Sequence, residues 1–377
     1  MKDSVLLRKD GQNSSALLST LGLETFRNYD QLHLELGSGL NVIEGPNAQG
    51  KTNLLEAIYL LSTTRLLRGQ RDGEAIKEGT HRARVSALTA EIETRLEIVL
   101  EKGLRKKALI NGLGLPRASD IMGRLPSVCI SAVDMAIVRG DPADRRMFLD
   151  LDLSSLYPAY LRHFAAYKRA LEQRNALLKE AREHRIPEDV FEPWEMHLSE
   201  HGAAIRRMRM DYVANLAPVA EQRHELMGDG ESLKVSYQLK DEAGSSEALT
   251  LELARSRGQD IARGSTGIGP HRDDLRITID GLEARLYGSQ GQQRTSVVSI
   301  KLASLEVVTN QLGSKPLLLM DDIFSDLDIR RRALLVEIVI EKAGQALLTC
   351  TEAESAGKRI LELAQLFSVR GGEVTKH

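Results

Sequence analysis

A glycine-rich segment between an apolar run and a helical run constrains the fold of this chain most. Residues 45–52 read Gly-Pro-Asn-Ala-Gln-Gly-Lys-Thr and match the pattern G-x-x-x-x-G-K-[ST]. The apolar run Leu40–Ile43 comes directly before it, and apolar residues recur at helical spacing after it, from Leu54 to Leu61. Strand, loop and helix in this order open an α/β unit, so we expect the α/β fold class.

The backbone of such a loop binds phosphate, because its N–H groups point inward at the N-terminus of a helix. We expect Lys51 to contact the β- and γ-phosphates of ATP, in a binding and catalytic role, and the Thr52 hydroxyl to hold Mg²⁺. The alternative, a glycine-rich turn before a helix, does not account for the whole pattern. ATP and Mg²⁺ are therefore the predicted cofactors. The predicted nucleotide-binding residues here are Gly45, Pro46, Asn47, Ala48, Gln49, Gly50, Lys51, Thr52 and Asn53.

A buried strand that ends in two carboxylates predicts the second half of the site. Residues 316–320 read Pro-Leu-Leu-Leu-Met, and Asp321 and Asp322 follow. In open parallel sheets, ligands bind at the carboxyl ends of the strands. We therefore expect Asp321 to hold the Mg²⁺ water shell and Asp322 to be the catalytic residue that orients the attacking water. A simple turn after the strand is the alternative.

A second anion-binding segment precedes that strand. Residues 288–294 read Gly-Ser-Gln-Gly-Gln-Gln-Arg and lead into an amphipathic helical run. A serine hydroxyl and glycine amides at a helix N-terminus bind anions. One chain does not need two cradles for one γ-phosphate, so we expect Ser289, Gly291 and Gln292 to contact the nucleotide of a facing subunit. A capped helix with a flexible lead is the alternative.

The N-terminal part of the chain begins with an aperiodic tail and continues with strand-like patterns. Residues 1–17 are polar and aperiodic, and we expect a disordered tail there. Strands are expected between Leu21 and Ile43, and again between Val85 and Ile110, where Asn111-Gly112 marks a turn.

The middle of the chain has a helical pattern instead. Apolar and aromatic residues recur at helical spacing over residues 156–185 and 194–226, and strand-like alternation returns near Val235. We therefore predict a helical arm at residues 151–227, inserted into a head formed by residues 18–150 and 228–377. Helices that simply cover the sheet are the alternative.

Composition narrows the possible partners. The net charge is −2, so contacts with nucleic acid would have to come from local basic patches. The two cysteines, Cys129 and Cys350, cannot form a disulfide framework or a four-thiolate zinc site, and we expect both to be buried. No stretch reaches the roughly 18 apolar residues of a membrane-spanning helix. We expect a cytoplasmic protein with no membrane partner.

The order of these segments resembles an ABC-type ATPase head. The phosphate loop, the Ser-Gln-Gly-Gln-Gln signature and the acidic strand are followed by Ser-Asp-Leu-Asp at residues 325–328. Two further segments resemble the RecF family. Residues 140–150 resemble its G-x-P-x-x-R-R-x-[FY]-L-D element, and residues 269–274 match its Gly-Pro-His-Arg-Asp-Asp element. Where many ABC proteins have a switch histidine, this chain has Thr349 and Thr351, as RecF proteins do, and their role stays open.

This resemblance implies a P-loop ATPase head with an inserted helical lobe, acting in recombinational repair. It implies a homodimer that closes over two ATP molecules, with Ser325 and Asp328 in the loop facing the partner subunit. It also implies binding of duplex DNA at or near single-strand gaps, weak DNA-stimulated ATP hydrolysis, and assistance to RecA loading together with RecR and RecO.

Three groups of basic residues are candidates for DNA contacts. Each can neutralise phosphates without reading bases, although a solvated charged face is the alternative. We favour Arg65, which we expect to lie near ATP. The groups are Arg65, Arg68 and Arg71 after the P-loop helix, Lys102, Arg105, Lys106 and Lys107 before a turn, and Arg206, Arg207 and Arg209 on the predicted arm.

Two other functions use the same kind of ATP site. A transporter motor usually carries a Leu-Ser-Gly-Gly-Gln signature and a switch histidine, which this chain lacks. A small-molecule kinase rarely separates its P-loop from its acidic strand by about 270 residues, as this chain does. Salt-dependent retention on duplex DNA, with and without ATP, would separate the three functions.

Overall fold

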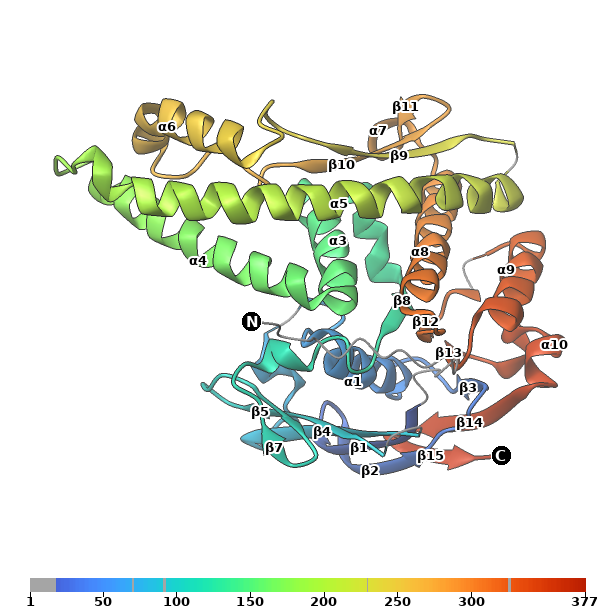
Figure 1. The fold of residues 1–377 in the computed structure, drawn as a ribbon. Helices are drawn as coiled ribbons and strands as arrows, with labels where there is room; N and C mark the ends of the chain where they lie inside the picture. The colour runs from blue at the N-terminus through green and yellow to red at the C-terminus, as the bar shows by residue number, and fades with distance from the viewer. Residues whose placement is uncertain (1–17, 70, 91–92, 229, 325–326) are drawn as a thin grey trace.

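The computed structural model describes residues 18–69, 71–90, 93–228, 230–324 and 327–377. Two six-stranded sheets lie in the lower part of Figure 1, and long helices with a three-stranded sheet form the upper part. The tail predicted at residues 1–17 lies outside the described residues.

The first large sheet is antiparallel, with the strand order β2-β1-β4-β5-β6-β7. Asn111 and Gly112 have φ of 52° and 79°, the left-handed pair that a two-residue hairpin favours, and they join the last two strands. The strands predicted in this part of the sequence are confirmed. They are β1 (Leu18–Phe26), β2 (Tyr29–Glu35), β4 (Arg82–Thr89), β5 (Arg95–Glu101), β6 (Lys107–Ile110) and β7 (Leu113–Gly114).

The second large sheet is parallel except at one edge, with the order β15-β14-β3-β13-β12-β8. Its central strands β12 and β13 are mostly apolar because both faces of the sheet are covered. The predicted acidic strand is confirmed as β12, in the interior of the sheet. The members are β3 (Leu40–Glu44), β8 (Ser127–Ile130), β12 (Leu317–Asp321), β13 (Ala346–Cys350), β14 (Ala364–Arg370) and β15 (Glu373–Lys376).

Helix α1 (Lys51–Thr63) packs between the two large sheets. Its Leu54, Ile58 and Leu61 are fully buried and belong to a core that both sheets share. Other helices cover the opposite face of the parallel sheet, and their apolar residues form a second core. These helices are α8 (Gln290–Leu312), α9 (Ile329–Lys342) and α10 (Lys358–Leu361).

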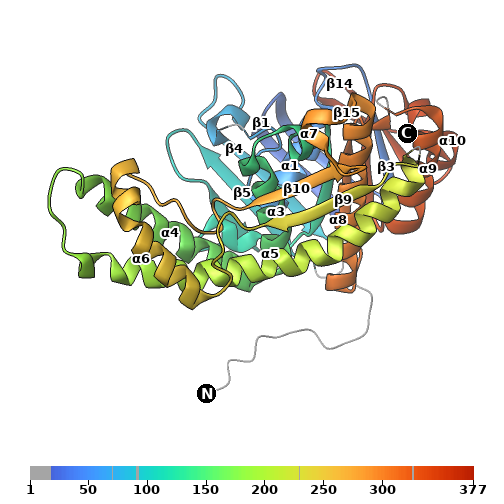
Figure 2. The ribbon, with the colours of Figure 1, turned by 90° about the horizontal axis from the view of Figure 1, so that it is seen from above.

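Two long helices, α4 (Pro158–Glu180) and α5 (Glu192–Met227), pack along each other and project from the head (Figures 1 and 2). The first predicted helical run begins in α3 (Pro142–Leu156) and continues as α4, and the second lies within α5, so both runs are confirmed as helical. The short α2 (Ala136–Arg139) precedes α3.

The strands that follow the arm do not join the large sheets. They form a separate sheet with the order β11-β10-β9, which packs along α5 together with α6. Residues 233–279 therefore pack on the arm, although the sequence analysis grouped them with the head. These elements are β9 (Leu233–Gln238), α6 (Ser246–Arg263), β10 (Asp274–Ile279), β11 (Leu282–Glu283) and α7 (Ala284–Tyr287).

Helix α8 contributes to two cores at once. Its Val298 and Leu302 pack with the parallel sheet, whereas Ile300 and Val307 pack with the arm. The division of the chain into head and arm at residues 150 and 228 is therefore an interpretation, since one helix belongs to both. Short 3₁₀ helices complete the described structure at Asp72–Ala75, Ala118–Ile121, Ala132–Met135, Glu188–Val190 and Ala353–Ala356.

The two cysteines lie in adjacent parts of the core. Cys129 and Cys350 are 3% and 0% exposed and unpaired, which confirms the predicted burial. Burial raises the pKa of both thiols, that of Cys350 to about 11, so neither is a reactive thiolate at neutral pH.

Candidate nucleotide-binding site

The fold itself requires the glycines in the loop between β3 and α1. Gly45 has a φ of +150° and Gly50 a φ of +121°, conformations that other residues rarely adopt. A Cβ on Gly45 would lie 2.3 Å from the carbonyl oxygen of Val369. A Cβ on Gly50 would lie 2.7 Å from the Asn28 amide nitrogen and from the Tyr29 hydroxyl. The loop is therefore held in one shape directly before the helix.

Lys51 lies within this loop. Its Nζ donates hydrogen bonds to the carbonyl oxygens of Gly45 (2.5 Å) and Pro46 (2.9 Å), and the residue is 7% exposed. A buried ammonium beside backbone amides at a helix N-terminus attracts a ligand with several negative charges. The arrangement fits the phosphate chain of a nucleotide.

Thr52 and Asp321 meet although they are 269 residues apart in the sequence. The Thr52 hydroxyl donates to the Asp321 carboxylate, with distances of 2.9 Å to Oδ1 and 3.1 Å to Oδ2. Neighbouring ligands of an octahedral Mg²⁺ with bonds of about 2.0–2.1 Å lie about 2.9 Å apart. Both donors are the hard oxygens that this ion prefers, so the pair fits Mg²⁺ and would hold it directly or through its water.

Thr349, on β13, contacts both acidic residues at the end of β12. Its hydroxyl donates to Asp321 Oδ1 (2.8 Å) and accepts from the backbone N–H of Asp322 (3.1 Å). Thr349 is fully buried, and Asp322 has a φ of +51°, an uncommon conformation that clusters at functional sites. The sequence left the role of Thr349 open, and the structure places its hydroxyl between the Asp321 carboxylate and the Asp322 backbone.

The turn between β1 and β2 supports the phosphate loop, a contact that sequence reasoning missed. Asn28 Nδ2 donates to the Gln49 carbonyl oxygen (2.9 Å), and Asn53 Nδ2 donates to Asn28 Oδ1 (2.8 Å). The Tyr29 hydroxyl donates to the Gly50 carbonyl oxygen (3.1 Å). The side chain of Asn53 therefore faces this turn. The sequence marked Asn28 and Tyr29 only as part of a turn, and nothing in their spacing indicated the loop as their partner.

The second predicted cradle lies at the N-terminus of α8. Ser289 Oγ accepts from the Gln292 N–H (3.2 Å), and Gln292 Oε1 accepts from the Ser289 N–H (2.7 Å). The helix is thus capped, as the alternative interpretation held. Ser289 and Gly291 are exposed, and a Cβ on Gly291 would meet nothing closer than 4.0 Å. Packing against the described residues does not explain this glycine.

In the predicted dimer loop, Asp328 is the N-cap residue directly before α9, and Ser325 lies outside the described residues. Asp328 Oδ1 accepts from the Arg331 N–H (2.9 Å), and its side chain is 52% exposed. Asp328 therefore caps a helix at an accessible surface.

The two segments that resemble the RecF family contact each other. The Arg145 guanidinium donates to both carboxylate oxygens of Asp274, at 2.7 Å and 2.9 Å. Arg146 Nη1 donates to the carbonyl oxygen of Asp273 (2.7 Å). These segments thus join α3 to β10, between the head and the arm.

The candidate DNA-binding residues differ in accessibility. Arg65, Arg68 and Arg71 are exposed. Lys106 Nζ instead donates to the Thr64 carbonyl oxygen and to Asp72. Lys107 is 66% exposed and lies 3.9 Å from Glu101.

Arg65 follows the C-terminal end of α1, whereas the phosphate loop precedes its N-terminal end. The 13 residues of this helix span about 20 Å. The prediction that Arg65 lies near ATP of its own chain is therefore wrong.

The prediction of a basic DNA-binding surface at Arg206 and Arg209 is also wrong. Both are almost fully buried, at 1% and 2% exposed. Arg206 forms ion pairs with Asp241 and Asp273, and Arg209 with Asp150. Arg207, between them, is exposed.

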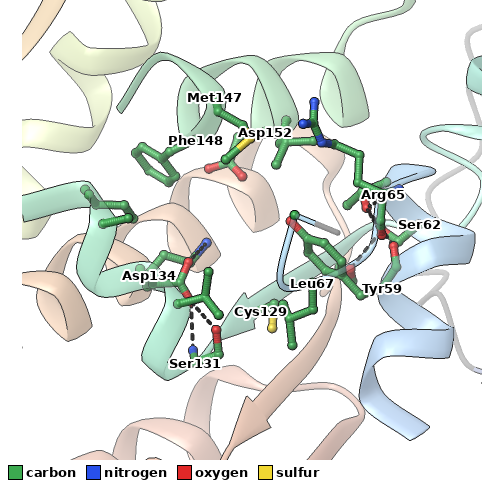
Figure 3. A pocket seen from close by; sticks show the side chains of 18 of the residues that line it. Tyr59, Ser62, Arg65, Leu67, Cys129, Ser131, Asp134, Met147, Phe148 and Asp152 are labelled. Carbon is green, nitrogen blue, oxygen red and sulfur yellow. Dashed lines mark hydrogen bonds and ion pairs between the residues drawn. The ribbon is translucent and has the colours of Figure 1, made fainter. Parts of the chain in front are cut away.

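A cavity of about 220 Å³ lies beyond the C-terminal end of α1, between this helix, α3 and α8 (Figure 3). Tyr59, Arg65, Asp134 and Asp152 line it, with the buried Lys301. Burial lowers the pKa of Lys301, but the charges of Asp134 and Asp152 outweigh this effect and raise it. The phosphate-loop residues do not line this cavity, so it is distinct from the nucleotide site.

A phosphate loop before a helix enclosed by two sheets, an acidic parallel strand and an inserted helical lobe together define an ABC-type P-loop ATPase head. Residues 17–375 match the family model described as RecF/RecN/SMC N terminal domain. The DNA replication and repair protein RecF of Symbiobacterium thermophilum is 41% identical over 369 residues, 95% of this chain and 97% of that protein. The RecF of Synechococcus sp. (strain JA-3-3Ab) is 38% identical over 371 residues, again 95% and 97%. This chain belongs to the RecF family.

Solved structures agree with this assignment. A structure described as the recombination mediator protein RecF-ATP in the RecFOR pathway is 32% identical, with a TM-score of 0.88 over 98% of this chain and 100% of that one. An Smc head domain from Pyrococcus furiosus, 15% identical with a TM-score of 0.55 over 96% of each chain, shares the fold. Among the residues described, none of the helices is both long and apolar enough to cross a membrane.

Proposed function

We propose that this chain is an ATP-dependent DNA-binding protein of recombinational repair. Two copies close over two ATP molecules, bind duplex DNA at or near single-strand gaps, and hydrolyse ATP slowly with stimulation by DNA. The relatives named as replication and repair proteins support this role, as does the relative described with ATP in the RecFOR pathway. RecR and RecO are then the expected partners, and loading of a RecA-type protein in the cytoplasm is the expected outcome.

One observation supports the proposal, namely that a second helix N-terminus with an exposed serine and glycine lies apart from the phosphate loop. The phosphate loop contacts Asp321 within the chain. The second N-terminus, at Ser289 and Gly291, is exposed. A glycine in a helix is about 1 kcal/mol less favourable than alanine, and no neighbour within the chain needs Gly291. The close approach of a γ-phosphate bound to a second copy gives this glycine a function.

The residues of the site have separable tasks in hydrolysis. Lys51 neutralises the β- and γ-phosphates, and Thr52 and Asp321 would hold a Mg²⁺ ion, which would add positive charge at the phosphate oxygens. Asp322 orients the attacking water and accepts its proton. Thr349 holds the Asp321 carboxylate and the backbone of Asp322 in position through its single hydroxyl.

The DNA contacts are assigned to the exposed arginines that follow α1, with Arg65 first among them. Arg65, Arg68 and Arg71 lie on one short segment and can each neutralise one phosphate. ATP and DNA then communicate through α1, which connects the phosphate loop to this segment. Lys107 is a further candidate, whereas Lys106 is already engaged by Asp72.

The proposal is tested with Ser289→Arg. A bulky cation at this position obstructs the approaching γ-phosphate, so ATP-driven dimerisation should be lost while ATP binding by the monomer persists. Ser245→Arg is the matched control, because Ser245 is also an exposed N-cap whose hydroxyl accepts a backbone N–H. Both variants lose a helix cap, worth about 0.5–2 kcal/mol. Light scattering with ATP and Mg²⁺ should show dimers for the parent protein and for Ser245→Arg, but not for Ser289→Arg.

Mixing Ser289→Arg with Lys51→Ala protein sharpens this test. The heterodimer keeps one intact composite site. In it, the unchanged phosphate loop of the Ser289→Arg subunit faces the unchanged Ser289 of the Lys51→Ala subunit. Partial recovery of ATP-dependent association on mixing supports action in trans. Normal dimerisation of Ser289→Arg alone would refute the assignment of Ser289 to a partner's nucleotide. Salt-dependent retention on duplex DNA in the presence of ATP separates this function from a transporter motor and from a kinase, neither of which needs DNA.

A further inference from the structure

Three histidines converge between the two long helices of the arm. His163 lies on α4, and His197 and His201 lie on α5. The Nδ1 atoms of His163 and His201 are 3.1 Å apart. Ligand atoms of His197, Glu200 and His201 all lie within 4.8 Å of one another. Three possible ligands on α5 thus lie close together, and His163 on α4 lies within 3.1 Å of one of them, His201.

The helical spacing explains this convergence on α5. Residues three and four apart lie on the same helical face, so the sequence His-Leu-Ser-Glu-His places His197, Glu200 and His201 side by side. The rings of His197 and His201 are stacked with centroids 5.9 Å apart, and the rings of His163 and His201 have centroids 5.2 Å apart. His163 therefore approaches the α5 pair from the neighbouring helix.

We propose that His163, His197 and His201 form a binding site for a divalent transition-metal ion of the zinc class, with Glu200 as the fourth donor. A tetrahedral Zn²⁺ with Zn–N bonds of about 2.0–2.1 Å has ligand atoms about 3.3–3.4 Å apart. The 3.1 Å between the Nδ1 atoms of His163 and His201 is close to that separation. His197 and Glu200 are exposed, so small rotations of their side chains can bring their ligand atoms to an ion held between His163 and His201.

The donor set distinguishes this site from the nucleotide site. Three imidazoles suit Zn²⁺, Co²⁺, Ni²⁺ or Cu²⁺, whereas Mg²⁺ and Ca²⁺ prefer oxygen ligands. A bound ion would also connect α4 to α5, because His163 comes from one helix and the other ligands come from the other. The ion would thus stiffen the arm independently of ATP.

The single tryptophan reports directly on this site. The Trp194 ring lies 6.5 Å, centroid to centroid, from the His197 ring, and the chain has one tryptophan. Co²⁺ is a suitable probe because it accepts the same ligands as Zn²⁺ and quenches nearby fluorescence. The full-length protein, freed of metal with a chelator and kept without nucleotide, is titrated with Co²⁺ while tryptophan fluorescence is recorded. One equivalent should quench the signal, and Zn²⁺ should compete with it.

Variants identify the ligands. His163→Asn and His201→Asn should each weaken Co²⁺ binding at least tenfold. His184→Asn should leave it unchanged, because His184 is an exposed histidine outside the cluster. Unchanged ATP binding and urea denaturation of each variant verify that it folds. Absence of saturable quenching, or equal Co²⁺ affinity of His201→Asn and the parent protein, overturns the site. Full affinity in His163→Asn overturns the connection between the two helices.

Discussion

Replacing Thr349 with valine tests the interaction that links the two acidic residues of the candidate site. The side chain keeps almost the same volume but loses its hydroxyl. The Asp322 N–H retains the Thr349 carbonyl oxygen at 3.2 Å, and Asp321 retains the Thr52 hydroxyl. The loss is therefore one hydrogen bond to a charged acceptor, a group of interactions worth about 1.5–3 kcal/mol.

This loss should appear in hydrolysis rather than in ATP binding. The hydroxyl of Thr349 contacts the carboxylate that fits Mg²⁺ and the backbone of Asp322, the residue proposed to position the attacking water, whereas Lys51 and the phosphate loop are unchanged. If the whole free energy of the lost hydrogen bond adds to the activation barrier, the single-turnover rate of ATP hydrolysis falls about 10- to 100-fold. The affinity for ATP without Mg²⁺ should change less than about threefold, since it depends mainly on the phosphate loop.

Thr349→Ser is the matched control, because it keeps the hydroxyl and loses only a buried methyl group. The serine variant should hydrolyse ATP within about threefold of the parent rate, since the hydrogen bond to the charged carboxylate is retained. Equal rates for the valine variant and the parent protein would show that the hydroxyl does not position the carboxylates. A serine variant as slow as the valine variant would assign the effect to packing of the methyl group instead.

Three further changes test other parts of the structure. Asp322→Asn should keep ATP binding but slow hydrolysis in a single-turnover assay and accumulate the ATP-bound dimer, because an amide does not accept the proton of water. Arg206→Leu leaves the buried carboxylate of Asp273 without its cation, so urea denaturation followed by tryptophan fluorescence should show a loss of about 3–5 kcal/mol. Arg207→Leu, the exposed neighbour, should stay within about 0.5 kcal/mol of the parent. Burial lowers the pKa of His271 from 6.5 to about 4. The unfolded chain then binds the proton more readily, so stability present above pH 6.5 is lost as the pH falls towards 4, by about 2 kcal/mol between pH 7.5 and pH 5. His271→Gln should remove this part of the pH dependence, and an equally steep profile would contradict the reasoning.

The parts of the site that the sequence predicted are those that short segments determine. The glycines at 45 and 50 have backbone conformations that few other residues adopt, so the phosphate loop is readable from eight consecutive residues. The same holds for the Asn111-Gly112 hairpin and for the apolar strand that ends at Asp321. In each case the physical cause lies within a few residues of the pattern.

The contacts that the sequence did not predict join distant segments. Thr349 reaches Asp321 from a neighbouring strand, and that pairing depends on the order of the strands in the sheet. Arg206 illustrates a different difficulty. It is buried on the arm helix α5, but its partners Asp241 and Asp273 lie 35 and 67 residues away in the sequence. Without those partners in view, a buried arginine is indistinguishable from a solvated one.

The position of β3 in the sheet has a consequence for protein synthesis. Both of its neighbours, β13 and β14, are formed by residues after 345, whereas β3 ends at Glu44. The ribosome must therefore add 301 residues (345 − 44) between the end of β3 and the start of β13, which at roughly 5–20 residues per second takes about 15–60 s. Both edges of an apolar strand stay unpaired throughout that time, a condition that favours aggregation or chaperone binding. Since Thr349 arrives with β13, a nascent chain also lacks the contacts of Thr349 with Asp321 and Asp322 during that time.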